Sequence, residues 1–546
     1  MNEARGHRAA ENHATVVAPE PHPDRPVPAV PRNAFHAQWS LARFESARVL
    51  RHPAFVTAVL LYVALWAYEA LGVGIRGRYP VLQDEDRYTQ VPLLLPAAGG
   101  IVATHLAVTR MHRHGAAPLC DVLELPLWRR VLAHFGAALP PTAVAAVLAA
   151  ARISYYASAP TAVGRPSLVE LATGPAVVLL ACCAGVTLAC FTPAVTAGPL
   201  AAVVMGTLVL CSALDVRGMK WWGPLGVESE FGAPLPVDLM HRPALTHLGY
   251  LAAVTGVLVL LALVRAGAHT RPVRSALVLL VVTAVLAGVL QYRPPSDALV
   301  ARRYTAEQHP GDQQRCRTAD LVTFCAFPDF LNRTKDWRTV TDGILDQVPD
   351  GAQRGPYAVR QRLFLGGDRD GVIGKPPPEW ARDDALHHTP GAVTVGTRWG
   401  TDDLGGDEML AFAVRFARRV VVGPGHEGEP HPEMLCRARA VTVLWLAAQA
   451  TSETADALRS LQRRSFGGIT LSTLDSSEAV SINMPEARVV LDLLDRPADN
   501  VADRLHASWP VLVDDRTSTE QAARLLGVSP PTDAERGSEG TACATR

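Results

Sequence analysis

The first half of the chain is dominated by long apolar stretches, the last of which ends at Leu290, and the second half has none. A helix needs about 20 mostly apolar residues to cross the hydrocarbon layer of a membrane. Seven stretches approach that length, and they are apolar all round, which argues against amphipathic core helices of a soluble protein. We therefore predict seven membrane spans, at 54–73, 91–108, 131–150, 168–190, 194–214, 246–264 and 275–290.

The remaining segments differ sharply in composition. Residues 1–34 are Pro-rich with no apolar centre, so we expect a disordered tail and no cleavable signal sequence. Residues 293–530 mix short apolar runs with helical periodicity, and 531–546 form a second disordered tail. The predicted fold class is an α-helical polytopic membrane protein, spanning residues 54–292, with a C-terminal, mostly helical α+β soluble domain.

The distribution of basic residues indicates the orientation. With seven crossings, the two ends of the chain lie on opposite sides of the membrane. A cytoplasmic N-terminus would place one set of connecting segments inside the cell. Arginines are denser in that set than in the outer segments, although the difference in the number of basic residues is modest. We therefore predict a multi-pass protein of the cell membrane with a cytoplasmic N-terminus and the C-terminal domain outside.

Two cysteines in the polar half bear on the same question. Cys316 and Cys325 lie close together in CRTADLVTFC, just after the last span. On the oxidising side of a membrane they are near enough to close a short disulfide loop, while the alternative is two unrelated thiols. We predict the disulfide, and no role follows from the sequence for Cys436 and Cys543.

Two segments next to the spans carry the most specific patterns. Residues 35–53 place Leu41, Phe44 and Ala47 on one helical face and arginines elsewhere, which favours a helix lying in the headgroup layer, against a plain cytoplasmic extension of the first span. The second segment, TRMHRHGAAPLCDVLELPLWRRVLAH, has arginines at both ends and a short helical run that stops at Pro126. Its shape suits the docking of a partner.

This loop resembles the first cytoplasmic loop of the permease subunits of type-two ABC exporters, especially actinobacterial ones, where a basic stretch precedes a Glu-Leu helix, a Leu-Pro step and paired arginines. The segment LARFESARVLRHPAF is similar to the amphipathic elbow helix of those permeases, and HRPALTHLGYLAAV is similar to the start of their sixth span. The resemblance covers about residues 35–291. The usual permease core has six spans, so the seventh is a departure that would carry the C-terminal domain outward.

The resemblance implies a transmembrane subunit that exports a solute when a separate ABC ATPase hydrolyses ATP. It also implies a homodimer or heterodimer of permease subunits in the lipid bilayer. The loop helix would be the coupling helix that docks on the ATPase, with these residues in the docking surface: Asp121, Glu124, Leu125, Pro126, Arg129 and Arg130.

The chain carries no motif for chemistry of its own. GVIGKPPP has proline where a phosphate-binding loop needs a hydroxyl, and no His-Glu-x-x-His or Gly-x-Ser-x-Gly occurs. The cluster GHEGEPHPE is interpreted as a solvated loop, and His387 and His388 have no obvious partners. We expect no enzyme activity, metal, cofactor or nucleic acid.

Two classes of function remain open. In an exporter, the ionisable residues near span ends are candidates for the solute pathway: Glu69, Arg152 and Glu170. Their positions at the edges of the spans favour the alternative that their charged groups reach water. The alternative is a non-transporting membrane anchor that presents a binding or sensory domain outside. An anchor has no use for an ATPase-docking loop, so that loop discriminates the two.

Overall fold

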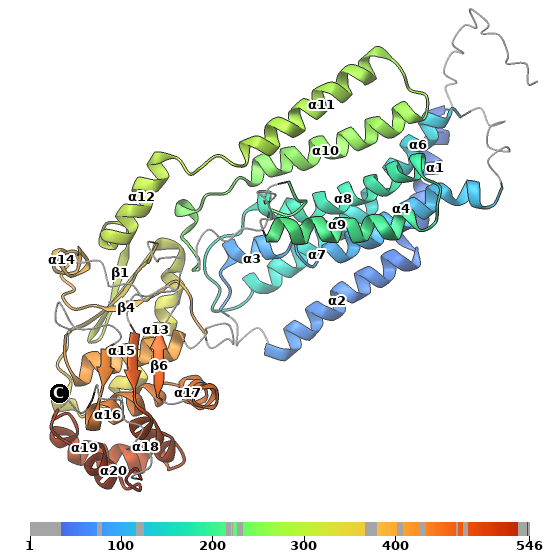
Figure 1. Ribbon diagram of the computed structural model, residues 1–546. Coiled ribbons are helices and arrows are strands. Elements are labelled where there is room, and N and C mark those ends of the chain that lie inside the picture. The colour runs from blue at the N-terminus through green and yellow to red at the C-terminus, as the bar shows by residue number, and fades with distance from the viewer. Residues whose placement is uncertain are drawn as a thin grey trace, which may run out of the picture.

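The structure is a computed structural model that describes residues 34–73, 79–115, 125–214, 220, 222–226, 233–365, 379–400, 408–424, 433–465, 468–472, 479–532 and 543. An elongated helical bundle occupies the N-terminal half, and a mixed domain of helices and strands follows it (Figure 1). The helices of the N-terminal half are α1 Ala34–Leu50, α2 Pro53–Val73, α3 Leu82–Tyr88, α4 Leu94–Arg113, α6 Leu127–Gly136, α7 Leu139–Ala157, α8 Leu168–Phe191, α9 Ala197–Ala213, α10 Ala244–Arg265 and α11 Arg271–Leu290.

Among the described residues, six helical stretches are long and apolar enough to span a membrane. They correspond to six of the seven predicted spans, and the chain is a helical membrane protein by this measure. The predicted fifth span is α9, an apolar helix of 17 residues that is shorter than the others. At about 1.5 Å per residue it falls a little short of the hydrocarbon thickness. The seven predicted spans are therefore found as six full-length apolar stretches and one shorter apolar helix at the place of the fifth.

The third span is longer than predicted and is broken. It runs from Leu127 to Ala157 in two parts, α6 and α7, which are separated by a turn before Pro140 and Pro141. Proline lacks a backbone N–H and suits only the first turn of a helix, so the pair begins α7 and interrupts the hydrogen bonding from α6.

Helices α4 and α8 form the centre of the bundle. Helix α4 packs against α2, α8 and α9, and α8 also contacts α7 and α10. Small residues allow this approach: a Cβ on Gly185 would lie 2.5 Å from the carbonyl oxygen of Ile101, and one on Gly99 would lie 2.7 Å from that of Ala54. Helices α2 and α11 lie at the periphery, with most of their apolar surface exposed.

The C-terminal domain combines two small sheets with helices. Its elements are α12 Asp297–Gln308, β1 Arg315–Ala319, β2 Val322–Ala326, α13 Thr334–Leu345, β3 Tyr357–Gln361, α14 Glu379–Leu386, β4 Val393–Val395, α15 Glu408–Val421, β5 Glu433–Leu435, α16 Arg437–Ala448, α17 Ser452–Arg464, β6 Ile469–Ser472, β7 Ala479–Ile482, α18 Met484–Leu494, α19 Ala498–Leu512 and α20 Thr519–Leu526. The first sheet has the order β1-β2-β3-β4, in which β2, β3 and β4 are parallel, and the second has the order β5-β7-β6.

One hydrophobic core joins both sheets into a single domain. Helices α15 and α16 pack against each other at its centre and are buried along almost their whole length. Phe412 and Trp445 are both fully buried there. Apolar residues on all sides of these two helices therefore reflect burial within the domain and not a membrane span.

Helical periodicity in the sequence predicts five helices in this domain, at 408–421, 432–450, 452–463, 485–494 and 500–509. The first and third coincide with α15 and α17 to within one residue. Two details differ. The helix expected from Pro432 begins only at Arg437, because Glu433–Leu435 pairs with β7 as a strand. Pro510, which the sequence marks as a helix stop, lies inside α19, and the helix ends two residues later at Leu512.

The two ends of the bundle carry different structures. Helices α1 and α6 lie at one end, and the C-terminal domain lies at the other, connected through α12 (Figure 1). The predicted cytoplasmic helix and the predicted external domain are thus separated by the length of the bundle.

Candidate functional site

The predicted ATPase-docking loop connects α4 to α6, and only its ends can be described. Asp121 and Glu124 lie outside the described residues. Pro126 immediately precedes α6 in an extended conformation, and Arg129 and Arg130 lie in the first turn of that helix. The Arg129 guanidinium stacks on the ring of Trp128, with 4.9 Å between the guanidinium carbon and the ring centroid.

Helix α1 holds both ends of this loop. It packs against α4 and α6, and its Glu45 accepts a hydrogen bond of 2.9 Å from Arg110 near the end of α4. The Glu45 side chain is 1% exposed, so this charge is paired in a desolvated position. The buried face of α1 consists of Ala42, Glu45 and Val49, while the predicted apolar face includes Phe44, which is exposed as a lipid-facing residue would be.

The three ionisable residues predicted near the span ends are found in ion pairs. Arg152 donates to Glu69 at 2.9 Å, and the Tyr156 hydroxyl donates to the same carboxylate at 3.0 Å. Glu170 lies 3.8 Å from the Arg87 Nε and accepts a hydrogen bond of 3.3 Å from Gln90. Arg152 and Glu170 are buried, which corrects the view that all three reach water; only the Glu69 side chain is partly exposed.

A polar network beneath the C-terminal domain was not foreseen. Asp86, on α3, accepts hydrogen bonds from the Ser167 N–H at 2.6 Å and from Arg242 at 3.1 Å. Asp86 is completely buried, and Arg242 also donates to the backbone oxygen of Gln83. These contacts join three connections of the bundle: α2 to α4, α7 to α8, and α9 to α10. The acidic run at 84–86 signals a polar segment, but nothing local predicts a partner 156 residues away.

Burial controls the protonation of two carboxyl groups in this network. Desolvation raises the pKa of Asp84 to about 6, against the attraction of Arg87 and Arg242. Desolvation also raises the pKa of Asp86, although Arg242 and the Ser167 N–H favour its charged form. Asp84 therefore titrates near neutral pH, whereas an exposed aspartate would stay ionised.

The C-terminal domain docks on the same three connections through a 3-10 helix, η4 (Pro328–Arg333). Arg333 donates to the backbone oxygens of Thr161 at 3.1 Å and Tyr79 at 3.2 Å. Asp329 accepts from the Val237 N–H at 2.9 Å. Apolar side chains from both parts form one buried cluster around these bonds: Val81, Val163, Leu235, Leu239, Ala306, Phe327, Phe330 and Leu363.

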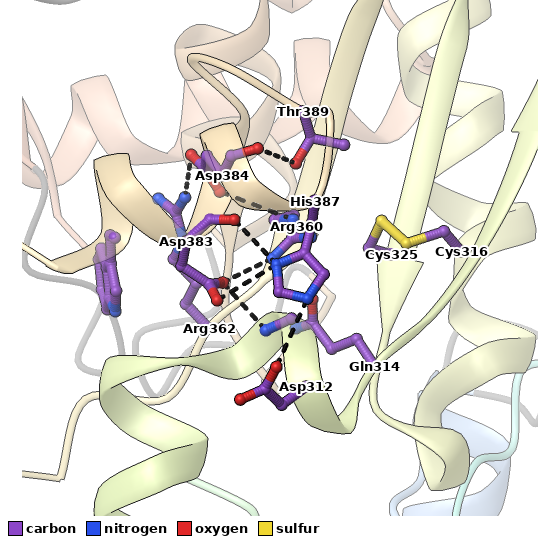
Figure 2. Close-up of polar contacts among 12 residues, drawn as sticks. Asp312, Gln314, Cys316, Cys325, Arg360, Arg362, Asp383, Asp384, His387 and Thr389 are labelled. Atoms are coloured by element: carbon purple, nitrogen blue, oxygen red, sulfur yellow. Dashed lines mark hydrogen bonds and ion pairs between the residues drawn. A yellow bond between two sulfur atoms is a disulfide. The ribbon is translucent and has the colours of Figure 1, made fainter.

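A second charged cluster lies inside the C-terminal domain, where β3 meets α14 (Figure 2). Arg360 donates to Asp383 at 2.7 Å and Arg362 donates to Asp384 at 2.6 Å, with all four side chains buried. Burial lowers the pKa of Arg360 and raises that of Asp384. These pairs fix α14 to the strand, and we assign them a structural role.

The same view revises the interpretation of His387, which has partners after all. Its Nδ1 lies 2.9 Å from the Asp383 backbone oxygen, and its Nε2 lies 3.6 Å from an Asp312 carboxylate oxygen (Figure 2). The described residues contain no group of three or more His, Cys, Asp or Glu side chains that could hold a metal ion. Of the cluster GHEGEPHPE, only Glu433 is described, and it pairs with Arg418 at 3.0 Å.

Two disulfides occur in the C-terminal domain. Cys316 and Cys325 are joined, as the sequence predicts, and occupy directly paired positions on β1 and β2. Cys436 and Cys543 are joined as well, which the sequence did not reveal because they are 107 residues apart.

Comparisons with protein-family models, with curated proteins and with solved structures gave no significant match.

Proposed function

We propose that the chain is the transmembrane permease subunit of an ABC transporter, which exports a solute with the energy of ATP hydrolysed by a separate ATPase subunit. In this proposal the ATPase docks on the 110–130 loop on the cytoplasmic side. The main support for this proposal is that α1 contacts both ends of that loop, through the hydrogen bond between Glu45 and Arg110 and through packing on α6.

This arrangement offers a mechanical path from the loop into the bundle. A force on the loop would act on α1, α4 and α6 together, because they are packed and cross-linked by a buried ion pair. Helix α4 passes the displacement on, since it packs against α2, α8 and α9 through contacts too close for larger residues. A helix that served only as an anchor would need no such connection to a loop.

The placement of the C-terminal domain supports its external location. It lies at the end of the bundle opposite to α1, so a bundle that spans the membrane puts the two on different sides (Figure 1). Its two disulfides suit an oxidising compartment. We propose that the N-terminus is cytoplasmic and that the protein resides in the cell membrane.

A second permease subunit completes the proposed transporter. Helices α2, α9 and α11 expose large apolar side chains, including Leu65, Val203 and Leu286. Lipid covers part of this surface, and the remainder offers a surface for another copy or a related chain.

The experiment is capture of the partner. The full chain, tagged at its C-terminus, is purified from its native membranes in mild detergent, and co-purifying proteins are identified by mass spectrometry. We expect a protein with a phosphate-binding loop in the wild-type sample, and a loss of about tenfold for Glu124→Lys combined with Arg129→Glu, as expected when charged contacts of an interface are reversed.

Arg274→Glu is the matched control, because it reverses an exposed arginine in the first turn of α11 and leaves the docking loop intact. Equal capture of the ATPase by the loop variant would contradict the docking site. Absence of any ATPase from the wild-type sample would instead favour the alternative of a membrane anchor presenting an external domain.

A further inference from the structure

Helix η4 of the C-terminal domain lies at a junction of three chain segments. These are the connection from α2 to α3 around Tyr79, the connection from α7 to α8 at 159–165, and the segment before α10 at 235–241. Each segment joins two helices of the bundle at the end that faces the domain (Figure 1). The position of η4 therefore bears on whether these helix ends can separate.

Arg333 ties two of the segments together. Its guanidinium is 1% exposed, and it donates separate hydrogen bonds to the Thr161 and Tyr79 carbonyl oxygens. It also lies over the Tyr79 ring, 5.3 Å from the centroid, and 3.7 Å from Asp336. Burial lowers the pKa of Arg333 to about 10, which leaves it charged at neutral pH. A planar cation with several donors can bridge two carbonyls in this way, while lysine cannot do so with the same geometry.

Asp329 ties in the third segment. Its carboxylate accepts from the Val237 N–H at 2.9 Å and lies 3.3 Å from the Arg165 Nε. Its backbone oxygen accepts from the Gly164 N–H at 2.9 Å. This one residue thus contacts both the α7 to α8 connection and the segment before α10.

The same three connections are also joined from within the bundle. Asp86, Ser167 and Arg242 link α3, the start of α8 and the start of α10. The outer ends of the helices are therefore held by two layers of contacts, one internal and one supplied by the C-terminal domain.

We propose that the C-terminal domain is an autoinhibitory clamp: η4 holds the three connections together, and the bundle opens at this end only when η4 is released. The inference rests on the proposed function, because only a transporter needs to open this end. Release would open the buried apolar cluster that Phe330 of η4 shares with Val163, now 2% exposed, and Leu239, now 0% exposed.

The test measures that exposure directly. Val163→Cys is introduced into the full chain, which is reconstituted in lipid nanodiscs and treated with a membrane-impermeant maleimide. Modification at residue 163 is quantified by peptide mass spectrometry, so the native cysteines do not interfere. Combining Val163→Cys with Arg333→Gln or with Asp329→Asn is expected to raise the labelling rate about tenfold, because each removes buried hydrogen bonds that hold η4 in place.

Arg338→Gln is the matched control. Arg338 is an exposed arginine on α13, and its ion-pair partners Asp320 and Asp342 both belong to the C-terminal domain. It should leave labelling unchanged. If neither Arg333→Gln nor Asp329→Asn raises labelling above this control, the clamp is overturned.

A general unfolding of the domain would imitate release, and hydrogen exchange separates the two. Under the proposal, α15 and α16 stay protected in Asp329→Asn, since Asp329 lies outside the core that these helices form. If α15 and α16 lost protection, the increased labelling would come from unfolding of the domain, and the clamp would be overturned. The labelling experiment requires neither nucleotide nor ATPase, so its result does not depend on the transporter proposal. Failure of the transporter proposal would be detected separately, as the absence of an ATPase from the purified chain.

Discussion

Glu45, on the helix before the first span, accepts a hydrogen bond of 2.9 Å from Arg110, where the predicted docking loop begins. Arg110→Gln leaves the Glu45 carboxylate buried without its cation, so we expect a loss of about 3 kcal/mol in the free energy of unfolding. Glu45→Gln with Arg110→Gln should recover part of it, since no charge remains buried. Thermal unfolding of the detergent-solubilised chain measures both.

Arg43→Gln serves as the control for this pair, because Arg43 is an exposed residue of the same helix. A double variant that is as unstable as Arg110→Gln alone would show that the loss comes from packing and not from an unpaired charge.

Glycine packing between α4 and α8 predicts a second effect. In Gly185→Ala the new Cβ would lie 2.2 Å from the Thr104 hydroxyl and 2.5 Å from the Ile101 backbone oxygen, so the helices must move apart. We expect a destabilisation of about 2 kcal/mol, as for overpacking in a close-packed core. Gly206→Ala on α9 meets nothing within 4 Å and should be neutral or slightly stabilising, so equal melting temperatures for the two variants would contradict this packing.

Protonation of Asp84 predicts a pH dependence of stability. Its folded-state pKa of about 6 exceeds that of an unfolded aspartate, so the folded protein binds this proton more tightly. Stability is therefore greatest below about pH 4 for this group, falls as the pH rises through about 6, and is about 3 kcal/mol lower above that, by linkage.

Asp84→Asn should remove this dependence and raise the melting temperature at pH 7.5, with little change at pH 4. Asp346→Asn is the control, as Asp346 is an exposed carboxylate of the C-terminal domain. A melting temperature for Asp84→Asn that follows pH as in the wild type would exclude Asp84 as the titrating group.

The buried pair of Arg360 and Asp383 predicts a large loss on substitution. Asp383→Ala leaves the Arg360 guanidinium, which is 0% exposed, without its closest carboxylate. We expect a loss of about 3 to 5 kcal/mol, as for other broken buried pairs. Asp312→Ala removes a mostly exposed carboxylate at 3.6 Å from His387 and should cost less than about 1 kcal/mol. Denaturant unfolding of the full chain, monitored by tryptophan fluorescence, compares them.

The disulfides predict a thiol pattern that also reports location. The chain has nine cysteines, and the two disulfides engage four of them. In chain isolated from cells and denatured without reductant, alkylation and mass spectrometry should find free thiols at Cys182, Cys183, Cys190 and Cys211, whereas the four disulfide cysteines become reactive only after reduction. Cys120 lies outside the described residues. Nine free thiols before reduction would place the C-terminal domain in a reducing compartment and overturn its external location.

The sequence by itself determined the membrane segments and most helices of the C-terminal domain. Burial of an apolar helix in lipid depends on the residues of that segment alone, so 168–190 and 275–290 could be located without knowledge of their neighbours. The start of α2 at Pro53 and the limits of α15 follow from equally local signals. The disulfide between Cys316 and Cys325 could be predicted for a similar reason, because the two residues are paired across one hairpin and lie close in sequence.

Only the tertiary structure decided which polar groups meet. Asp86 and Arg242 are 156 residues apart, Glu69 and Arg152 are 83 apart, and Arg333 reaches a carbonyl 254 residues earlier in the chain. Each of these side chains alone fits an exposed position, because the local sequence around a charged residue does not identify its partner. The partners are chosen when helices and domain pack together, since desolvation then makes every unpaired charge costly.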